Sequence, residues 1–299
     1  MDLKQYLHEK ALEIEKALKT YIPSLPAEAE RLGEAMRYSL FAGGKRLRPI
    51  LTLASAEVVG GNPQVAMPAA CAIEFIHTYS LIHDDLPVMD DDDWRRGKPT
   101  SHKVFGEAQA LLAGDALLTH AFTILAASYK LDSVKPEKVL KVVLEIASAA
   151  GPEGMVGGQS ADIEQEGAIK AQAAPSVLKY IHTHKTGSLI MASVRAGAIL
   201  GGATLKQLKL LTTYGKKLGL AFQICDDILD ATGDPKLLGK PVKTDATHKK
   251  LTYVTVHGLQ EAKNAARRLA FEAVESLTEF NELADPLRAI AHYAIQRRK

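Results

Sequence analysis

The chain has 299 residues, of which 46% are hydrophobic, and this is enough for a sizeable buried core. Its formal net charge of +2 argues against a nucleic-acid-binding protein, which usually carries a basic stripe. Its two cysteines, Cys71 and Cys225, stand in apolar runs. A disulfide scaffold or a cysteine zinc site is therefore not expected, and a reducing, cytoplasmic location is the simplest interpretation.

The N-terminal segment predicts an amphipathic helix, because Leu3, Leu7 and Ile14 fall on one helical face. Its charged residues argue against a signal peptide. A membrane span is not expected either, since no apolar run reaches about 18 residues without a charge. The segment 188–203 comes closest, and Arg195 interrupts it.

A junction between two predicted helices lies in the stretch FAGGKRLRP. The first helix is expected to end at the Gly-Gly pair and the next to open at Pro49. Three cations, Lys45, Arg46 and Arg48, stand between these breaks, where the free N–H groups of a new helix also point outward. This arrangement is typical of anion binding. Any one of these cations alone would most often be a surface residue, so the interpretation depends on what accompanies them.

The stretch SLIHDDLPVMDDDDWRRG places six aspartates within ten residues and two arginines directly after them. A helix is predicted up to Asp84, and Pro87 then disturbs it. The distortion would bring Asp90 back beside Asp84 in spite of the spacing of six residues. The alternative for this motif alone is a solvated acidic loop.

Helical periodicity continues through most of the chain, as in the stripe that contains Val142 and Ile146. Glycine and proline breaks cut the chain into helices of roughly 10–25 residues, and alternating strand patterns are scarce. Two segments, 108–128 and 187–203, are apolar on nearly every face, which is typical of a helix buried in a large bundle or at an interface. The sequence therefore predicts a single all-α domain over the whole chain, with helices packed around a central helix or cavity.

A second acidic motif stands in FQICDDILD. Asp226 and Asp230 are four residues apart, so their carboxylates share one helical face and repel each other by ~0.2–0.5 kcal/mol. Two such clusters in otherwise apolar helices need a compensating cation, and carboxylate oxygens suit Mg²⁺. Cations elsewhere in the chain, including Lys185 in HTHKTGS and Lys240 in LLGKP, then predict that the substrate is a diphosphate.

The chain resembles the trans-isoprenyl diphosphate synthase family over essentially its whole length, through the motifs GGKRLRP, IHTYSLIHDDLPVMDDDDWRRGKPTSH, LAGDALL, GGQSADIEQEG, HKTGSLI, GLAFQICDDILDATGD and LGK. It is most similar to the bacterial-type farnesyl diphosphate synthases, whose first motif has two residues inserted between the aspartates. The resemblance implies an all-α bundle of ten or more helices around a deep central cavity, and a homodimer.

By the same resemblance, the enzyme joins isopentenyl diphosphate to an allylic diphosphate with the help of Mg²⁺, expected as three ions per active site. The metal ligands are expected to be Asp84, Asp90 and Asp226, supported by Asp85, Asp227 and Asp230. The residues expected to bind isopentenyl diphosphate are Lys45, Arg48, His77 and Arg96, and those expected to bind the allylic diphosphate are Arg95, Lys185, Thr186, Gln223 and Lys240.

Product length is expected to depend on the helix before the first motif. Tyr79 lies five residues before Asp84, or ~7.5 Å lower along a helix. In the family that the chain resembles, bulk at this position limits the product, so Tyr79 would form the floor under the growing chain. Ser80 is small and should allow growth past ten carbons. The two residues together predict the fifteen-carbon product, farnesyl diphosphate, with geranylgeranyl diphosphate as the alternative.

Three other interpretations remain open. A class I terpene cyclase uses the same metal logic, but it generally carries an Asn/Ser/Glu second motif and lacks an isopentenyl site. A non-catalytic subunit of a heteromeric synthase usually loses one aspartate motif, whereas this chain has both. A metal-buffering protein would not need the basic residues.

Overall fold

The computed structural model describes residues 1–131, 134–165, 174–232 and 250–296. Helices make up nearly all of its regular structure, which confirms the predicted all-α class. The α-helices are α1 (Leu3–Tyr21), α2 (Glu30–Leu40), α3 (Leu47–Val58), α4 (Met67–Asp84), α5 (Ser101–Phe105), α6 (Glu107–Ala127), α7 (Pro136–Ala150), α8 (Met155–Gln165), α9 (Ala174–Ile181), α10 (Ser188–Gly201), α11 (Leu205–Thr232), α14 (Tyr253–His257), α15 (Leu259–Glu275) and α16 (Asp285–Gln296).

Short elements connect these helices. A two-residue hairpin pairs β1 (Trp94–Arg95) with β2 (Lys98–Pro99). A π-helix, η4 (His182–Gly187), joins α9 to α10. The 3₁₀ turns are η1 (Ala27–Ala29), η2 (Pro63–Ala66), η3 (Ser128–Lys130) and η5 (Glu282–Ala284).

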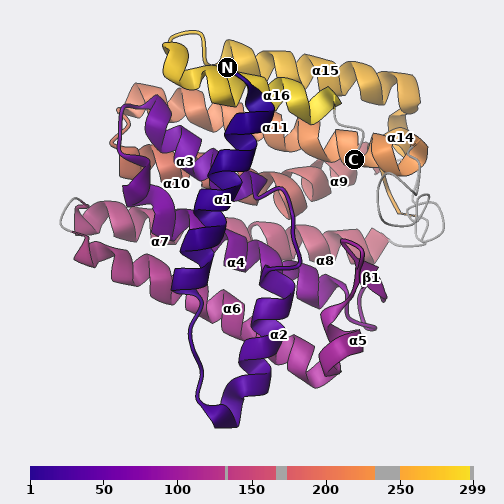
Figure 1. The fold of residues 1–299 in the computed structure, drawn as a ribbon. Coiled ribbons are helices and arrows are strands. Elements are labelled where there is room, and N and C mark those ends of the chain that lie inside the picture. The colour runs from indigo at the N-terminus through magenta and orange to yellow at the C-terminus, as the bar shows by residue number, and fades with distance from the viewer. Residues whose placement is uncertain (132–133, 166–173, 233–249, 297–299) are drawn as a thin grey trace.

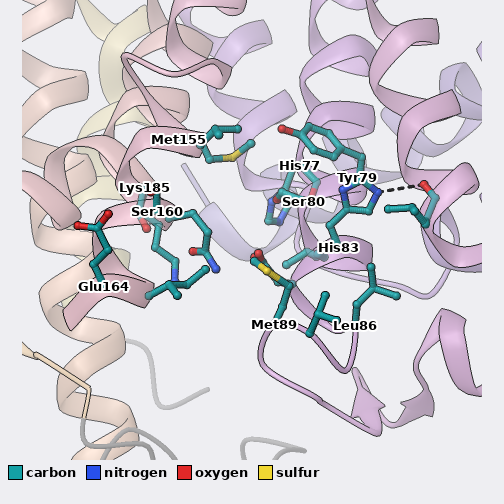
Figure 2. A pocket seen from close by; sticks show the side chains of 18 of the residues that line it. His77, Tyr79, Ser80, His83, Leu86, Met89, Met155, Ser160, Glu164 and Lys185 are labelled. Atoms are coloured by element: carbon teal, nitrogen blue, oxygen red, sulfur yellow. Dashed lines mark hydrogen bonds between the residues drawn. The ribbon is translucent and has the colours of Figure 1, made fainter. Parts of the chain in front are cut away.

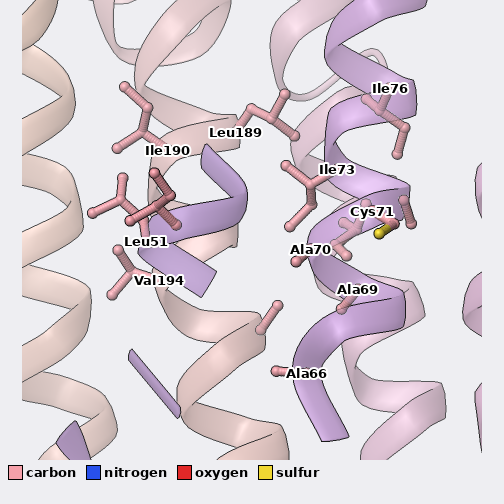
Figure 3. Packing of buried hydrophobic residues seen from close by; sticks show 14 of the residues in the cluster. Leu51, Ala66, Ala69, Ala70, Cys71, Ile73, Ile76, Leu189, Ile190 and Val194 are labelled. Atoms are coloured by element: carbon pink, nitrogen blue, oxygen red, sulfur yellow. The ribbon is translucent and has the colours of Figure 1, made fainter. Parts of the chain in front are cut away.

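The hydrophobic core is centred on α4 and α10. In Figure 1, α11, α15 and α16 lie along one side of the bundle, α6 and α7 lie along the opposite side, and α1 crosses the face between them. Figure 3 shows Ile73 of α4 and Leu189 of α10 in the space between these two helices, with Leu51 of α3 beside α10. α10 is buried along almost its whole length, so the prediction for segment 187–203 is confirmed.

The helix α6 has two apolar faces of different burial. Ala113 and Leu117 are fully buried, whereas Leu111 and Leu112 on the other face are exposed. By length and composition alone, two helical stretches are apolar enough to cross a membrane, namely 63–84, whose apolar window is 78% buried, and 107–130, whose window is 39% buried. The first is a core helix of the bundle, and the second presents its apolar face outward.

Chain reversals at the helix ends bring the predicted motifs together. α4 ends at Asp84, whose carbonyl accepts a hydrogen bond of 2.9 Å from the amide of Asp90, so the predicted return of the chain is confirmed. The β1–β2 hairpin then folds the guanidinium of Arg96 onto the carbonyl of Gly43, between α2 and α3. α3 already begins at Leu47, so the predicted helix start at Pro49 is wrong by two residues.

Candidate active site

A cavity of about 590 Å³ opens between α4, α6, α8 and the π-helix η4. Figure 2 shows Tyr79 and His83 on one side of it and Lys185 and Glu164 on the other, with Ser80 between them. A second cavity of about 90 Å³ shares Lys185 with the first and continues toward α11. The lining is charged near the ends of α4 and η4 and mostly apolar elsewhere.

The first aspartate motif forms the rim of the large cavity at the end of α4. Burial raises the pKa of Asp84 to about 6, and the neighbouring carboxyl of Asp90 adds to the rise while Lys185 opposes it. Burial would also raise the pKa of Asp90, but Lys250 donates to Asp90 at 3.0 Å and brings that pKa below its usual value. Asp84 is therefore the carboxylate of this motif that most lacks a counter-charge.

The third carboxylate of the first motif is held by an arginine of the hairpin. Arg95 donates from Nε to Asp85 at 2.6 Å and also pairs with Asp92 at 3.3 Å. Burial is the largest cause of the raised pKa of Asp85, and the bond from Arg95 opposes it. Arg95 thus fixes the carboxylate of Asp85. The sequence predicted Arg95 as a ligand of the allylic diphosphate, and this pairing with Asp85 was not predicted.

The second aspartate motif lies on α11 and is tied to η4 by a chain of hydrogen bonds. The hydroxyl of Thr186 donates to Gln223 at 2.6 Å, and the amide of Gln223 donates to Asp227 at 3.0 Å. Asp227 and Asp230 are buried, and Asp226 is half-buried and close enough to Arg48 for their charges to interact. The structure therefore brings Thr186 and Gln223 together as predicted.

The π-helix η4 presents Lys185 between the two motifs. Lys185 donates to Asp162 of α8 at 2.6 Å, and its charge also acts on Asp84. α8 can approach η4 this closely because Gly158 has no Cβ. A Cβ at this position would clash with the backbone of Lys185. Single π-turns inside helices occur frequently at functional sites. Neither this turn nor the partner Asp162 was predicted.

Lys250 is another residue of the site that the sequence did not reveal. It pairs with Asp90 and lines the smaller cavity together with Asp227. It is one of several lysines near the second motif, and nothing in the local sequence distinguishes it from its neighbours. Lys240, which was predicted to bind the allylic diphosphate, lies outside the described residues.

A basic cluster forms around the start of α3. Arg48 contacts the imidazole of His77 at 3.4 Å, and both residues line the large cavity. Burial, followed by the charge of Arg48, lowers the pKa of His77 well below its usual value, so His77 is neutral at pH 7. Arg96 lies against Gly44 of the same junction, and Lys45 lies 5.8 Å from the ring of Tyr293. The four predicted isopentenyl-site residues thus lie around one helix junction.

Arg46, which the sequence placed among these anion-binding cations, has a different position. Its side chain is completely buried, and it donates to Glu74 at 2.7 Å and to the carbonyl of Leu40 at 2.7 Å. Glu15 adds a third contact at 3.2 Å. Arg46 also adopts a left-handed backbone, with φ of 51°. It therefore fixes the junction from inside and does not face the cavity.

A further acidic group lies on the outer side of the first motif. One ligand atom each from Asp91, Asp93 and His102 lies within 4.8 Å of the others. Asp93 is already paired with Lys103 at 2.6 Å. Within the described residues, the predicted metal ligands do not form such a compact group. Mg²⁺ does not require this, because one or two carboxylates plus substrate phosphates usually hold it.

The cavity wall beside α6 is closed by an imidazole. The rings of Tyr79 and His83 meet edge to face at 5.6 Å, and Nε2 of His83 lies 3.0 Å from the carbonyl of Leu111. A Cβ at Gly114 would clash with this imidazole, so glycine makes room for it. Ser80 lines the same cavity and is half-buried.

The helical fold, the apolar cavity and the two aspartate motifs beside it define a class, the helical prenyltransferases. The chain belongs to the polyprenyl synthetase family, because the family model described as Polyprenyl synthetase matches residues 29–289. It is thus a transferase of isoprenoid biosynthesis with the all-α isoprenoid synthase fold, as the sequence motifs suggested.

Relatives in this family are named for different products. The chain is 51% identical to a farnesyl diphosphate synthase from Geobacillus stearothermophilus, over 91% of this chain and 89% of that protein. It is 48% identical to the large subunit 1 of a heterodimeric geranylgeranyl pyrophosphate synthase from Arabidopsis thaliana, over 99% of this chain and 80% of that protein. The solved structure of an FPP/GFPP synthase from Zymomonas mobilis has a TM-score of 0.84 at 37% identity, covering 98% of this chain and 99% of that one.

The buried ion pair of Arg46 gives a direct test of how the junction is held. Replacing Arg46→Met leaves the carboxylate of Glu74 buried without its partner, which should cost about 3–5 kcal/mol of folding free energy. The double variant Arg46→Met/Glu74→Leu removes both charges and should recover most of that loss. Urea unfolding followed by circular dichroism measures both. A double variant no more stable than the single one would contradict the assignment.

Proposed function

We propose that the chain condenses isopentenyl diphosphate with dimethylallyl and then geranyl diphosphate, and releases all-trans farnesyl diphosphate. The observation that carries this proposal is the position of the charges. Two carboxylate motifs, one basic cluster around Arg48 and one lysine, Lys185, border a cavity whose depth is apolar. A terpene cyclase would not need the basic cluster around Arg48, and a metal buffer would not need the cavity.

The residues at the rim fit Mg²⁺. Asp84 is a half-buried carboxylate whose pKa is raised by desolvation, so a bound cation would stabilise its ionised form. Asp84, Asp90 and Asp226 would ligate the metal, and Asp85, Asp227 and Asp230 would support them, partly through water. When bound, Mg²⁺ neutralises the leaving diphosphate of the allylic substrate. Three ions per site remain a proposal.

Two polar atoms at the large cavity also fit an anionic ligand. Within the described part of the chain, Nε of Arg48 and Oε1 of Gln159 are buried and have no hydrogen-bond partner. Buried polar groups are nearly always satisfied, so such atoms call for an explanation. A bound diphosphate would accept from Arg48, and a hydrated cation would donate to Gln159.

The two substrates are assigned to the two groups of cations. Lys45, Arg48, His77 and Arg96 would bind isopentenyl diphosphate, and Lys185 with Thr186, Gln223, Lys240 and Arg95 would bind the allylic diphosphate. Lys250 joins the second group, because it lies beside Asp90. Neutral His77 donates one N–H and adds no charge. Preorganised donors of this kind stabilise the charge that develops as the diphosphate leaves.

The apolar part of the cavity protects the reaction from water. Leu86, Met89 and Met155 are among its apolar lining residues. An allylic cation formed there reacts with the double bond of isopentenyl diphosphate and not with solvent, because the closed site excludes water. The condensed cation then loses a proton, and the released diphosphate is the base nearest to it. No side-chain base is required by this scheme.

The length of the prenyl product is inferred from the residues that close the inner end of the cavity. Tyr79 is buried, lines the cavity and packs against His83, so the two rings together would stop the growing tail. The farnesyl diphosphate synthase among the relatives supports a fifteen-carbon product. The geranylgeranyl pyrophosphate synthase subunit at similar identity supports the twenty-carbon alternative.

An exposed apolar face on α6 and α7 is the basis for proposing a homodimer. Leu111 and Leu112 on α6 and Leu140 and Leu144 on α7 are all exposed, with Leu140 at 70%. Large exposed apolar areas mark interaction surfaces. A second copy of the chain would cover this face. One relative is described as the large subunit of a heterodimer, so a different partner chain is the alternative to be tested.

Product analysis tests the proposed reaction. Purified protein with Mg²⁺, isopentenyl diphosphate and dimethylallyl diphosphate should give farnesol after dephosphorylation, and EDTA should abolish it. Asp84→Ala should lower turnover by at least a hundredfold, since each ~1.4 kcal/mol of lost stabilisation is tenfold in rate. Cyclic hydrocarbons from the wild type, or normal turnover in Asp84→Ala, would rule the proposal out.

The affinity for Mg²⁺ should depend on pH. Metal binding needs the ionised carboxylate, and the pKa of Asp84 is about 6. The apparent affinity should therefore be constant above about pH 7 and should fall about tenfold per unit below about pH 6. Calorimetry in buffers of different ionisation enthalpy measures the affinity and the proton released.

Two variants separate Asp84 from its neighbours in this measurement. Asp84→Asn removes the titrating group and should flatten the dependence between pH 5 and 7. Asp91→Asn changes an exposed aspartate of the same loop and should keep the wild-type profile. Identical profiles for the wild type and Asp84→Asn would show that Asp84 does not bind the metal.

The floor of the cavity can be moved in both directions. Tyr79→Ala should open it and give products of twenty carbons or more. Ser80→Phe should fill the space above it and shift the product toward ten carbons. Chromatography of the dephosphorylated alcohols resolves these lengths. Tyr129→Ala removes an exposed tyrosine elsewhere and should leave the product unchanged. Farnesol from both cavity variants would contradict the chain-length argument.

A further inference from the structure

A separate cavity of about 250 Å³ lies behind the second aspartate motif. It is enclosed by α9, α11, α14, α15 and the start of η4, at the end of the bundle where α14 lies between α11 and α15 in Figure 1. His182 lines both this cavity and the small cavity of the proposed active site. The wall between the two is therefore one side chain thick at this point.

The cavity has an apolar floor and a basic rim. Leu178, Ile224 and Ala265 are almost completely buried at its bottom. Lys179 and Arg268 are exposed at its edge, and Arg268 makes only a loose contact of 3.8 Å with Glu261. An apolar floor with cations at the mouth is complementary to an amphipathic anion.

The size of the cavity limits the ligand. Pockets for drug-sized ligands are roughly 300–1,000 Å³, and this one is smaller. It fits a short branched hydrocarbon tail, while the anionic head remains at the rim. A phosphate or diphosphate suits the rim better than a carboxylate, because its larger negative charge can pair with both Lys179 and Arg268.

The inner wall of the cavity connects directly to the second motif. His182 lies 3.3 Å from a carboxylate oxygen of Asp227, and the amide of Tyr253 donates to the same oxygen at 2.6 Å. Tyr253 also packs against His257 of the rim, with ring centroids 4.4 Å apart. Asp227 in turn accepts from Gln223, which accepts from Thr186. A ligand that displaces His182 or Tyr253 would move a carboxylate of the active site.

We propose that this cavity is a regulatory site for a short-chain prenyl phosphate or diphosphate, which acts on turnover through His182, Tyr253 and Asp227. That the ligand carries a prenyl group rests on the proposed function, whereas its amphipathic and anionic character follows from the cavity alone. Binding there positions Asp227 differently without occupying the substrate cavity. The effect on the reaction therefore includes a lower kcat, which a higher concentration of the allylic substrate does not restore.

Equilibrium dialysis with radiolabelled geranyl monophosphate tests the site without any reaction. With Mg²⁺ and no isopentenyl diphosphate, the wild type should bind two molecules per chain, one in the large cavity and one here. Leu269→Trp fills this cavity from α15 and should leave one. Arg268→Glu should weaken the second binding event at least tenfold. Arg267→Glu is the matched control, because Arg267 is also exposed but does not line the cavity.

The outcomes separate this proposal from the proposed function. One molecule per chain in the wild type, or two in Arg268→Glu with unchanged affinity, would overturn the site, and Arg268→Glu decides this even if Leu269→Trp does not fold. With Mg²⁺ and substrates, geranyl monophosphate should lower kcat in the wild type and not in Arg268→Glu. Purely competitive inhibition would overturn the coupling to Asp227. Failure of condensation would leave the dialysis result standing.

Discussion

Negative charge held in apolar surroundings is the constraint on which the rest of this structure depends. Asp84 ends a helix that is buried along nearly its whole length, and burial raises its pKa. Its neighbours are each compensated in a different way, Asp85 by Arg95 and Asp90 by Lys250. These cations therefore contribute to folding whatever they bind, because unpaired buried charges are costly.

The same constraint separates the polar and apolar parts of the cavity. The charges lie at the ends of α4 and η4, and the side chains below them belong to the core. Under the proposed function, the diphosphate head binds at the rim and the hydrocarbon tail extends along α4 toward Tyr79. In this proposal, one arrangement of helices accounts both for the reaction at the head and for the limit on the length of the tail.

Local patterns in the sequence predicted the contacts that are close along the chain or shared by known motifs. The return of Asp90 to Asp84 follows from Pro87, and the family resemblance implied that Arg48 and His77 belong to one site, where they are in contact. Contacts between distant helices were not visible. Arg46 has the same local surroundings as its cationic neighbours, and only Glu74, 28 residues away, shows why it is buried.

Two further features could not be predicted from the sequence, for similar reasons. The π-helix at His182–Gly187 has no breaker at its start and reads as ordinary helix, so its distortion comes from packing against α8 and α11. Gly114 looks like a weak point in a long helix, and only the imidazole of His83 explains the missing side chain. In each case tertiary contact, and not local propensity, decides the conformation.

The central claim is that the charged rim holds the head of the allylic substrate while the tail runs along α4. A crystal structure with Mg²⁺ and the unreactive geranyl thiolodiphosphate tests this most directly. The account predicts metal-bound oxygens of Asp84 and Asp226 on either side of the diphosphate, with the last carbon of the tail directed at Tyr79. A diphosphate bound away from both aspartates, or a tail directed away from Tyr79, would contradict it.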